Sequence, residues 1–188
     1  MIKTLRGLYR ALDDLFGDTK ALCAECQKDH RYQDCVGYVW LMREEAGKLL
    51  GVGVEVVVAN RNVYFLNSFS DGKGGMDIGM MKPPCPHCRS DGCSIRNLRP
   101  LACHMYPLGF SRESGILKLV LHMDCLFSER FGDGKAFRAR AAKLFRRIDP
   151  RLLRKIISAY RKVLDISIFP EGENKVDSLL NLQDEERR

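Results

Sequence analysis

Apolar and charged residues recur with helical spacing along the first sixteen residues of the chain. The apolar positions are Ile2, Leu5, Leu8, Leu12, Leu15 and Phe16, and charged residues fill the opposite face. This pattern predicts an amphipathic helix that ends near Gly17. Asp18 or Thr19 is placed to cap a second short helix that leads into Cys23 and Cys26.

Residues 35–66 have the composition of strands interrupted by a helix. The segment "CVGYVWLM" at 35–42 is rich in valine and aromatic residues and predicts a strand, which "REEAGKLL" follows as a helical turn or two. Residues 52–66 predict two further strands, which form a hairpin with its turn at 59–62.

A short helix and a second hairpin are expected after residue 99. Pro100 suits the first turn of a helix over residues 101–106, which Pro107 ends. The segment "LGFSRESGILKLVLHM" at 108–123 predicts a hairpin that turns at 113–115. Helices that flank a small sheet indicate the α+β class.

The carboxyl-terminal third contains two helical stripes. Residues 137–148 and 152–164 repeat apolar side chains at helical spacing. Asp149 and Pro150 break the pattern between them and can cap the second helix. From Pro170 onward the chain is acidic and polar, which predicts a flexible tail.

The composition predicts one folded domain with appendages. The chain has 188 residues, of which 45% are hydrophobic, enough for a single substantial core. We expect a domain over residues 1–134 that includes the N-terminal helix, a basic helical extension packed on its core over 135–168, and a flexible tail over 169–188.

The N-terminal segment lacks the apolar stretch and the small-residue cleavage site of a secretory signal. The longest run without Asp, Glu, Lys or Arg, residues 100–111, is too short to span a bilayer. We therefore expect a cytoplasmic protein without a transmembrane segment.

Eight cysteines give the strongest chemical signal. They are Cys23, Cys26, Cys35, Cys85, Cys88, Cys93, Cys103 and Cys125. Two pairs have the C-x-x-C spacing, which lets a tight turn aim two sulfur atoms at one metal ion. Because cytoplasmic thiols stay reduced, we expect the eight to be ligands of zinc or of an iron–sulfur cluster, such as a 4Fe–4S cluster. Four ligands complete either centre, so the chain holds enough for two sites, or for one site with spares.

Other uses of cysteine are open for parts of this set. A disulfide framework is typical of short secreted chains, and neither C-x-x-C pair opens the helix of an evident βαβ unit, as a thioredoxin-like redox motif would. Cys125, which follows Cys103 by 22 positions, is as consistent with a small buried apolar residue as with a ligand. Together, the cysteines and the predicted elements indicate a small cysteine-rich metal-binding core with short β-hairpins. The N-terminal helix and the basic C-terminal helical pair flank this core.

The segment "CSIRNLRPLACHMYP" at 93–107 resembles the C-x-I-Y-x-x-R-P-x-x-C-R-x-F/Y-P element of the YkgJ-type, or CxxCxxCC, cysteine-cluster family. The most specific matches are Ile95, Arg99, Pro100, Cys103, Tyr106 and Pro107. That family carries, further upstream, a CxxC pair, adjacent cysteines, a strand and a short helix with glutamates. Cys23, Cys26, Cys35, "GYVWL" and "REEAGKLL" follow the same order. The resemblance covers residues 20–125 and implies that the chain chelates zinc or iron.

The chain departs from the family pattern at several positions. Cys35 stands alone after Asp34 where the family has adjacent cysteines, and His104 replaces an arginine. Cys88 adds a thiol, so the resemblance implies that Cys88, Asp34 or His104 substitutes for a missing thiolate. One relative is a flagellin lysine methylase that uses S-adenosylmethionine. The glycine cluster "GKGG" at 72–75 is weak evidence for a nucleotide pocket.

Positive charge surrounds the cysteines and dominates the C-terminal helices. Arg89, Arg96 and Arg99 lie among the cysteines, where guanidinium groups offset the negative charge of a thiolate-bound metal. Residues 135–162 hold eleven Lys or Arg and one acid, Asp149, in a chain whose net charge is +7. This asymmetry suits an acidic protein, nucleic acid or an anionic membrane surface, and it is also compatible with a solvated helix face.

Three functions are compatible with these features. The first is a cytoplasmic protein that holds zinc or an iron–sulfur cluster and acts in electron transfer, in assembly or as a structural factor. The second is a cluster-dependent enzyme, such as an S-adenosylmethionine-dependent protein lysine methylase. The third is a nucleic-acid-binding module that zinc stabilises.

Overall fold

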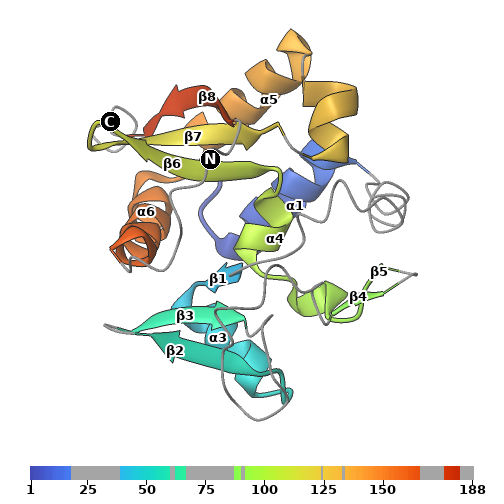
Figure 1. The fold of residues 1–188 in the computed structure, drawn as a ribbon, viewed down its shortest axis with the longest axis vertical. Coiled ribbons are helices and arrows are strands. Elements are labelled where there is room, and N and C mark those ends of the chain that lie inside the picture. The colour runs from blue at the N-terminus through green and yellow to red at the C-terminus, as the bar shows by residue number, and fades with distance from the viewer. Residues whose placement is uncertain are drawn as a thin grey trace. The chain divides into compact units, whose positions relative to one another are not determined.

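The computed structural model describes residues 1–17, 39–59, 62–66, 87–89, 92–123, 125–132, 134–165 and 176–182. Helices and small antiparallel sheets make up this part of the chain (Figure 1), which confirms the α+β class. The chain divides into two compact units, Met1–Asp18 with His104–Arg188 and Thr19–Cys103. We call these the first and the second unit. The expected helix leading into Cys23 and Cys26 lies outside the described residues, and the predicted domain limits at residues 134 and 168 stay predictions.

The first unit begins with the predicted amphipathic helix, α1 (Leu5–Phe16). The hydroxyl oxygen of Thr4 accepts a hydrogen bond from the backbone N–H of Gly7 at 3.1 Å and so caps the first turn. The helix ends at Gly17, whose φ of 65° is in the left-handed region that glycine adopts without steric cost. Leu8, Leu12 and Leu15 are its buried residues, which confirms the predicted apolar stripe.

The sheet of the first unit has the strand order β6-β7-β8. Strands β6 (Leu108–Glu113) and β7 (Ile116–His122) form the hairpin expected from the sequence. Its loop residues, Ser114 and Gly115, have φ angles of 49° and 78°. Two positive φ angles match the right-handed twist of the flanking strands.

Strand β8 (Val176–Asn181) pairs with β7 in antiparallel orientation (Figure 1). The acidic and polar sequence predicts a flexible tail over these residues, and the structure differs from that prediction. The physical reason is the apolar pair that ends the strand region, since Leu180 and Leu182 are buried against the first unit's core.

Two helices complete the first unit, α5 (Lys135–Arg146) and α6 (Pro150–Leu164), as predicted. A π-helical turn, η3 (Ser128–Gly132), precedes them. Asp149 caps α6 by accepting a hydrogen bond from the N–H of Arg151 at 2.9 Å, with Pro150 in the first turn.

Aromatic residues join these elements. Phe16, Phe127 and Phe137 pack with ring centroids 5.2 to 5.8 Å apart, and they tie α1 to α5. Phe110 of β6 packs edge-on against Phe145 of α5 and against Tyr160 of α6. Such offset contacts add to the free energy of burying the rings themselves.

The described residues of the second unit include a sheet of order β1-β3-β2 and a helix that covers it. Its strands are β1 (Val39–Leu41), β2 (Val56–Ala59) and β3 (Val63–Leu66), and the helix is α3 (Arg43–Leu50). The antiparallel β2–β3 pair confirms the predicted hairpin. Leu41, Ala46, Leu49 and Leu66 form the buried centre of this unit.

The cysteine-rich segment supplies the last elements of the second unit. They are β4 (Cys88–Arg89), β5 (Gly92–Cys93), the 3-10 turn η2 (Arg96–Leu98) and the start of α4 (Leu101–Met105). Helix α4 confirms the short helix expected after Pro100. The limit between the two units falls within this helix. None of the helices in the described ranges is long and apolar enough to cross a membrane.

Candidate metal centre

The two cysteines Cys88 and Cys93 are direct partners across an antiparallel pair. Strands β4 and β5 pair in the register Cys88 with Cys93 and Arg89 with Gly92, so a two-residue loop connects them. Opposite positions in such a pair have Cβ atoms about 4.5–5.5 Å apart. The backbone therefore brings two positions that are five residues apart in sequence to the same point of the hairpin.

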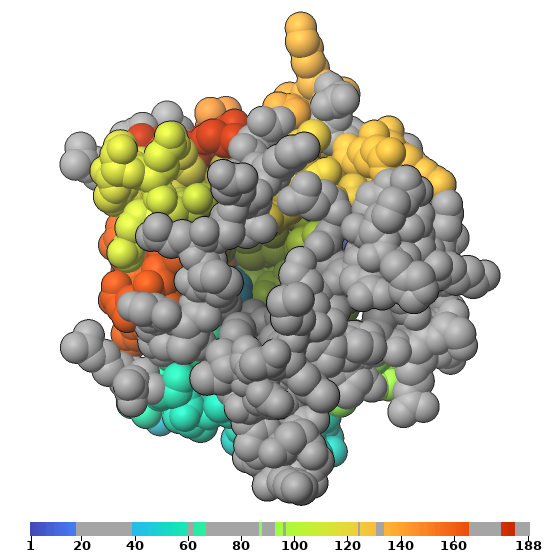
Figure 2. Space-filling view, viewed as in Figure 1, coloured from blue at the N-terminus to red at the C-terminus, as the bar shows by residue number. Residues whose placement is uncertain are grey.

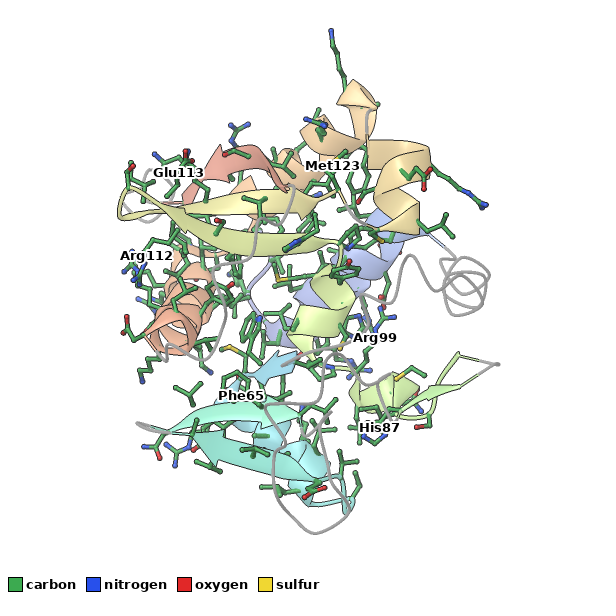
Figure 3. The ribbon with its side chains drawn as sticks, in the orientation of Figure 1. Phe65, His87, Arg99, Arg112, Glu113 and Met123 are labelled. Atoms are coloured by element: carbon green, nitrogen blue, oxygen red, sulfur yellow. The ribbon has the colours of Figure 1, made fainter. Side chains whose placement is uncertain are left out.

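The hairpin continues for one more residue pair. The N–H of Ser94 donates to the carbonyl of His87 at 2.8 Å, and the Nδ1 atom of His87 lies 3.4 Å from the Ser94 hydroxyl. Successive residues of a strand belong to opposite faces. His87 and Ser94 therefore share the face opposite to the positions of Cys88 and Cys93, and His87 marks this hairpin in Figure 3.

Apolar side chains anchor the segment after the hairpin. Ile95 and Leu98 pack against the buried centre of the second unit. The N–H of Leu98 donates to the carbonyl of Ile95 at 2.8 Å and closes the turn around η2. Half-buried Arg99 and buried Pro100 then lead into α4, and Figure 3 marks Arg99 at this point.

A buried carboxylate fixes the start of α4. Glu45, on α3, is 5% exposed, and its Oε1 atom accepts a hydrogen bond from the N–H of Leu101 at 2.6 Å. Its Oε2 atom accepts from the N–H of Met42 at 2.7 Å. Both oxygens thus satisfy N–H groups that lack a partner within their own helices. Cys103 lies two residues beyond this contact.

Among cysteines with described side chains, Cys93 and Cys103 are half-buried and Cys125 is buried, and none of these three forms a disulfide. Cys23, Cys26, Cys35 and Cys85 lie outside the described residues, as do Asp34 and the glycine cluster at 72–75. The side chains of Cys88, Arg89 and Arg96 also lie outside them. Within the described ranges, no three His, Cys, Asp or Glu side chains are grouped as a metal site.

Cys125 belongs to the first unit, and the other seven cysteines fall in the sequence range of the second. Cys125 is 8% exposed and belongs to the core of the first unit, at the start of the turn that leads to η3. A buried thiol behaves as a small apolar group. This position agrees with the reading of Cys125 as a core residue.

His104 has two partners on α1. Its Nδ1 atom lies 2.9 Å from the Oδ1 atom of Asp13, and its ring stacks on that of Tyr9 with centroids 4.5 Å apart and planes 6° apart. These contacts fix the orientation of the imidazole. A metal-bound histidine commonly makes such a carboxylate contact through its second nitrogen, and so does a histidine that serves packing alone, so His104 as a ligand stays a prediction.

Local sequence patterns did not predict the two features that organise this segment. In the β4–β5 hairpin Gly92 pairs with Arg89, so positions 90 and 91 connect the strands, and their Ser-Asp sequence is not a strong signal for a two-residue hairpin loop. The contact between Glu45 and Leu101 has no local signal, because it joins residues 56 positions apart.

Most of the exposed residues of α5 and α6 are lysines and arginines. Figure 2 shows part of α5, in orange, at the surface. The guanidinium of Arg140 lies 3.4 and 3.5 Å from the carbonyl oxygens of Leu15 and Asp14 at the end of α1. That cation therefore serves the fold by meeting carbonyl groups that a helix end leaves unpaired.

Comparison with known proteins adds no relative. The chain shows no significant match to any protein-family model, any curated protein or any solved structure.

Proposed function

We propose that the protein binds zinc or an iron–sulfur cluster through cysteine thiolates of the second unit. The observation that carries the proposal is the β4–β5 register, which makes Cys88 and Cys93 direct partners across a two-residue loop. The contact between Glu45 and Leu101 supports it, because this contact fixes the helix that carries Cys103.

The donor chemistry fits these metals. Zinc and iron–sulfur clusters prefer thiolate ligands, and zinc–sulfur bonds are about 2.3 Å long. Cβ atoms about 4.5–5.5 Å apart leave two sulfurs room to meet on one such centre. Cys93 and Cys103 form no disulfide in the structure, and a cysteine ligand must be a deprotonated thiol.

The remaining ligands of the proposed centre come from Cys23, Cys26, Cys35 and Cys85. When bound, the metal or cluster supplies structural cross-linking or a redox centre for electron transfer or assembly in the cytoplasm. The exposed cations of α5 and α6 are proposed to contact an anionic partner, an acidic protein or nucleic acid.

Anaerobic purification with iron, sulfide and zinc analysis tests the proposal. A brown protein with stoichiometric iron and sulfide selects a cluster, and a colourless protein with stoichiometric zinc selects a zinc site. A protein that contains neither, when isolated without air, contradicts the proposal.

Three serine variants assign the ligands. Cys93→Ser and Cys103→Ser are expected to lose metal, because each removes a thiolate. Cys125→Ser is the matched control, since its cysteine lies in the core of the first unit, and it is expected to retain metal. Retention of full metal by both of the first two variants overturns their assignment as ligands. Loss of metal from Cys125→Ser, with the fold intact by circular dichroism, adds Cys125 to the set.

A further inference from the structure

The turn between α5 and α6 concentrates exposed positive charge. Within thirteen residues the chain places six cations, and all six are exposed. They are Lys143, Arg146, Arg147, Arg151, Arg154 and Lys155, which we call the basic corner. The segment contains one acid, Asp149, whose side chain accepts the hydrogen bond from the N–H of Arg151.

This arrangement works against helix stability. Residues three or four positions apart are neighbours on a helix, and like charges there repel by a few tenths of a kcal/mol per pair. Lys143 has Arg146 and Arg147 at those spacings, and Arg151 has Arg154 and Lys155. Apart from Asp149, which follows Arg146 by three positions, no acid stands three or four positions from any member of the basic corner.

The helix dipole favours Lys143 and Arg146 in the last turn of α5, and it adds to the cost only at the start of α6. The N-terminal end of a helix favours acidic residues, yet the first turn of α6 contains none and Arg151 lies within it. On α1, by contrast, Arg10 is followed by Asp13 and Asp14 at the spacings that favour ion pairs. A helix face that only contacts solvent gains nothing from the repulsion between cations such as Arg151 and Arg154. A bound anion would offset this repulsion.

Two backbone hydrogen bonds to Ile2 hold the turn of the basic corner. The N–H of Ile2 donates to the carbonyl of Arg147 at 2.7 Å, and the N–H of Asp149 donates to the carbonyl of Ile2 at 2.8 Å. Ile148 between them is 4% exposed. The turn between α5 and α6 is therefore held in one conformation. A ligand that contacts both helices avoids the entropy cost of ordering this turn on binding.

The surface chemistry favours a polyanion over a folded acidic protein. Protein interfaces draw most of their binding energy from a few large side chains at a buried centre. Among the described residues, the large apolar side chains that are exposed are Met1, Leu50, Val52 and Val58, and none of them is on α5 or α6. Met1 alone belongs to the first unit, and one methionine at a chain end does not form such a centre.

We propose that the basic corner binds the phosphate backbone of nucleic acid, independently of base sequence. The inference rests on the anionic partner proposed above and names its class. Cations that neutralise phosphates release condensed counterions, so affinity falls steeply with salt, by about 0.9 in log K per log salt for each phosphate contact on duplex DNA.

The test compares two variants of the whole chain, purified anaerobically, in which exposed cations are replaced by neutral glutamine. The basic-corner variant combines four substitutions, Lys143→Gln, Arg147→Gln, Arg151→Gln and Arg154→Gln. The control variant combines Arg6→Gln and Arg10→Gln, at two exposed positions of α1 in the same unit. Fluorescence anisotropy with a labelled DNA duplex of random sequence gives the affinity over a range of salt concentrations.

The wild type and the control are expected to bind with a similar steep salt dependence. The basic-corner variant is expected to bind about tenfold or more weakly at low salt, with a slope smaller by about 2–4. Circular dichroism checks its fold, which the removal of like-charge pairs should leave intact. Equal loss in both variants, or no duplex binding by the wild type, overturns the proposal.

Two further probes separate the other anionic partners. Polyglutamate that competes as well as unlabelled duplex at equal charge concentration overturns the assignment to phosphate, as does preferential binding to vesicles containing phosphatidylserine. Because metal content is measured separately, failure of duplex binding leaves the metal proposal standing, and a metal-free protein that still binds duplex separates the two in the other direction.

Discussion

The Oε1 atom of Glu45 and the backbone N–H of Leu101 are joined by a hydrogen bond of 2.6 Å, across 56 positions of the sequence. The second oxygen of the same carboxylate accepts from the N–H of Met42 at 2.7 Å. One buried side chain thus accepts hydrogen bonds from backbone N–H groups at the start of both α3 and α4. The charge of the carboxylate makes both bonds stronger than those of a neutral acceptor.

Glu45→Gln is expected to destabilise the second unit by about 1–3 kcal/mol. The amide retains one acceptor oxygen, so one of the two N–H groups meets an NH₂ group in place of an oxygen. Glu45→Ala is expected to cost more, because it leaves both N–H groups unsatisfied. Urea unfolding followed by the fluorescence of Trp40, the single tryptophan and a buried residue of β1, measures the change.

The matched control for this prediction is Glu55→Gln. Glu55 is exposed and belongs to the same unit, so its neutralisation is expected to change the unfolding free energy by less than about 0.5 kcal/mol. Equal midpoints for Glu45→Gln and Glu55→Gln would show that the buried carboxylate does not stabilise the unit.

Gly109→Ala is expected to destabilise the first unit by about 1–3 kcal/mol. A Cβ atom on Gly109 would lie 2.5 Å from the Nε2 atom of His122 and 3.0 Å from its Cδ2 atom. The ring would have to shift from its stacked position on Tyr106, where the two centroids are 5.9 Å apart. Thermal unfolding by circular dichroism measures the loss.

A double variant tests the cause of that loss. Gly109→Ala in a His122→Ala background is expected to cost much less, since the clashing ring is gone, and the difference is the coupling energy of the two positions. Gly47→Ala is the control for the glycine replacement itself. Gly47 is on α3 with nothing within 4 Å of the added Cβ, so alanine there is expected to stabilise the helix by about 0.5–1 kcal/mol. An uncoupled cycle would mean that backbone effects, not the ring, explain Gly109.

Local patterns predicted most of the elements in the described residues. The apolar spacing of α1, the Asp-Pro break before α6 and the Ser-Gly turn at 114–115 each determine backbone geometry within a few residues. Strand β8 was missed because its sequence, Val-Asp-Ser-Leu-Leu-Asn, lacks the alternation of a half-buried strand, and Leu180 is buried only once the strand pairs with β7. Pairing between distant segments is a tertiary property.

The candidate centre was predictable as a set of residue types, and not as an arrangement. Spacing identified Cys88, Cys93 and Cys103 as ligand candidates, yet the register that makes the first two partners depends on a hairpin whose connecting residues, Ser-Asp at 90–91, are not a strong turn signal. The contacts of Glu45 and of His104 join residues 56 and 91 positions apart. No local pattern encodes such partners, because they follow from how whole elements pack.

Asp13→Ala is expected to destabilise the first unit by about 0.5–1.5 kcal/mol, through loss of its contact with His104. The carboxylate is 51% exposed, so solvent screens part of the interaction. Asp14→Ala is the control, since Asp14 is also exposed on α1 and its contact with Arg140 uses the backbone oxygen. Thermal unfolding of the two variants should differ, and indistinguishable midpoints would mean that the contact contributes nothing measurable.

Tyr160 predicts a loss of stability at high pH. Its hydroxyl donates a hydrogen bond to the carbonyl of Phe110 at 2.9 Å, and burial raises the pKa of Tyr160 to about 12. In the unfolded chain a tyrosine pKa is about 10. Between these values the folded state holds a proton that the unfolded state has released. The stabilising effect is therefore complete below pH of about 10 and is lost as the pH rises through about 12, at a cost on the order of 2 kcal/mol.

Tyr160→Phe isolates this effect from the lysines and other tyrosines that titrate in the same range. At pH 8 the variant is expected to be less stable than the wild type by about 1 kcal/mol, because it lacks the hydrogen bond to Phe110. Phenylalanine has no proton to lose, so the gap should shrink and then reverse as the pH approaches 12. Urea unfolding of both proteins at pH 8, 10 and 11.5 measures the gap. A constant gap at all three values would mean that the Tyr160 hydroxyl ionises equally easily in the folded and the unfolded chain.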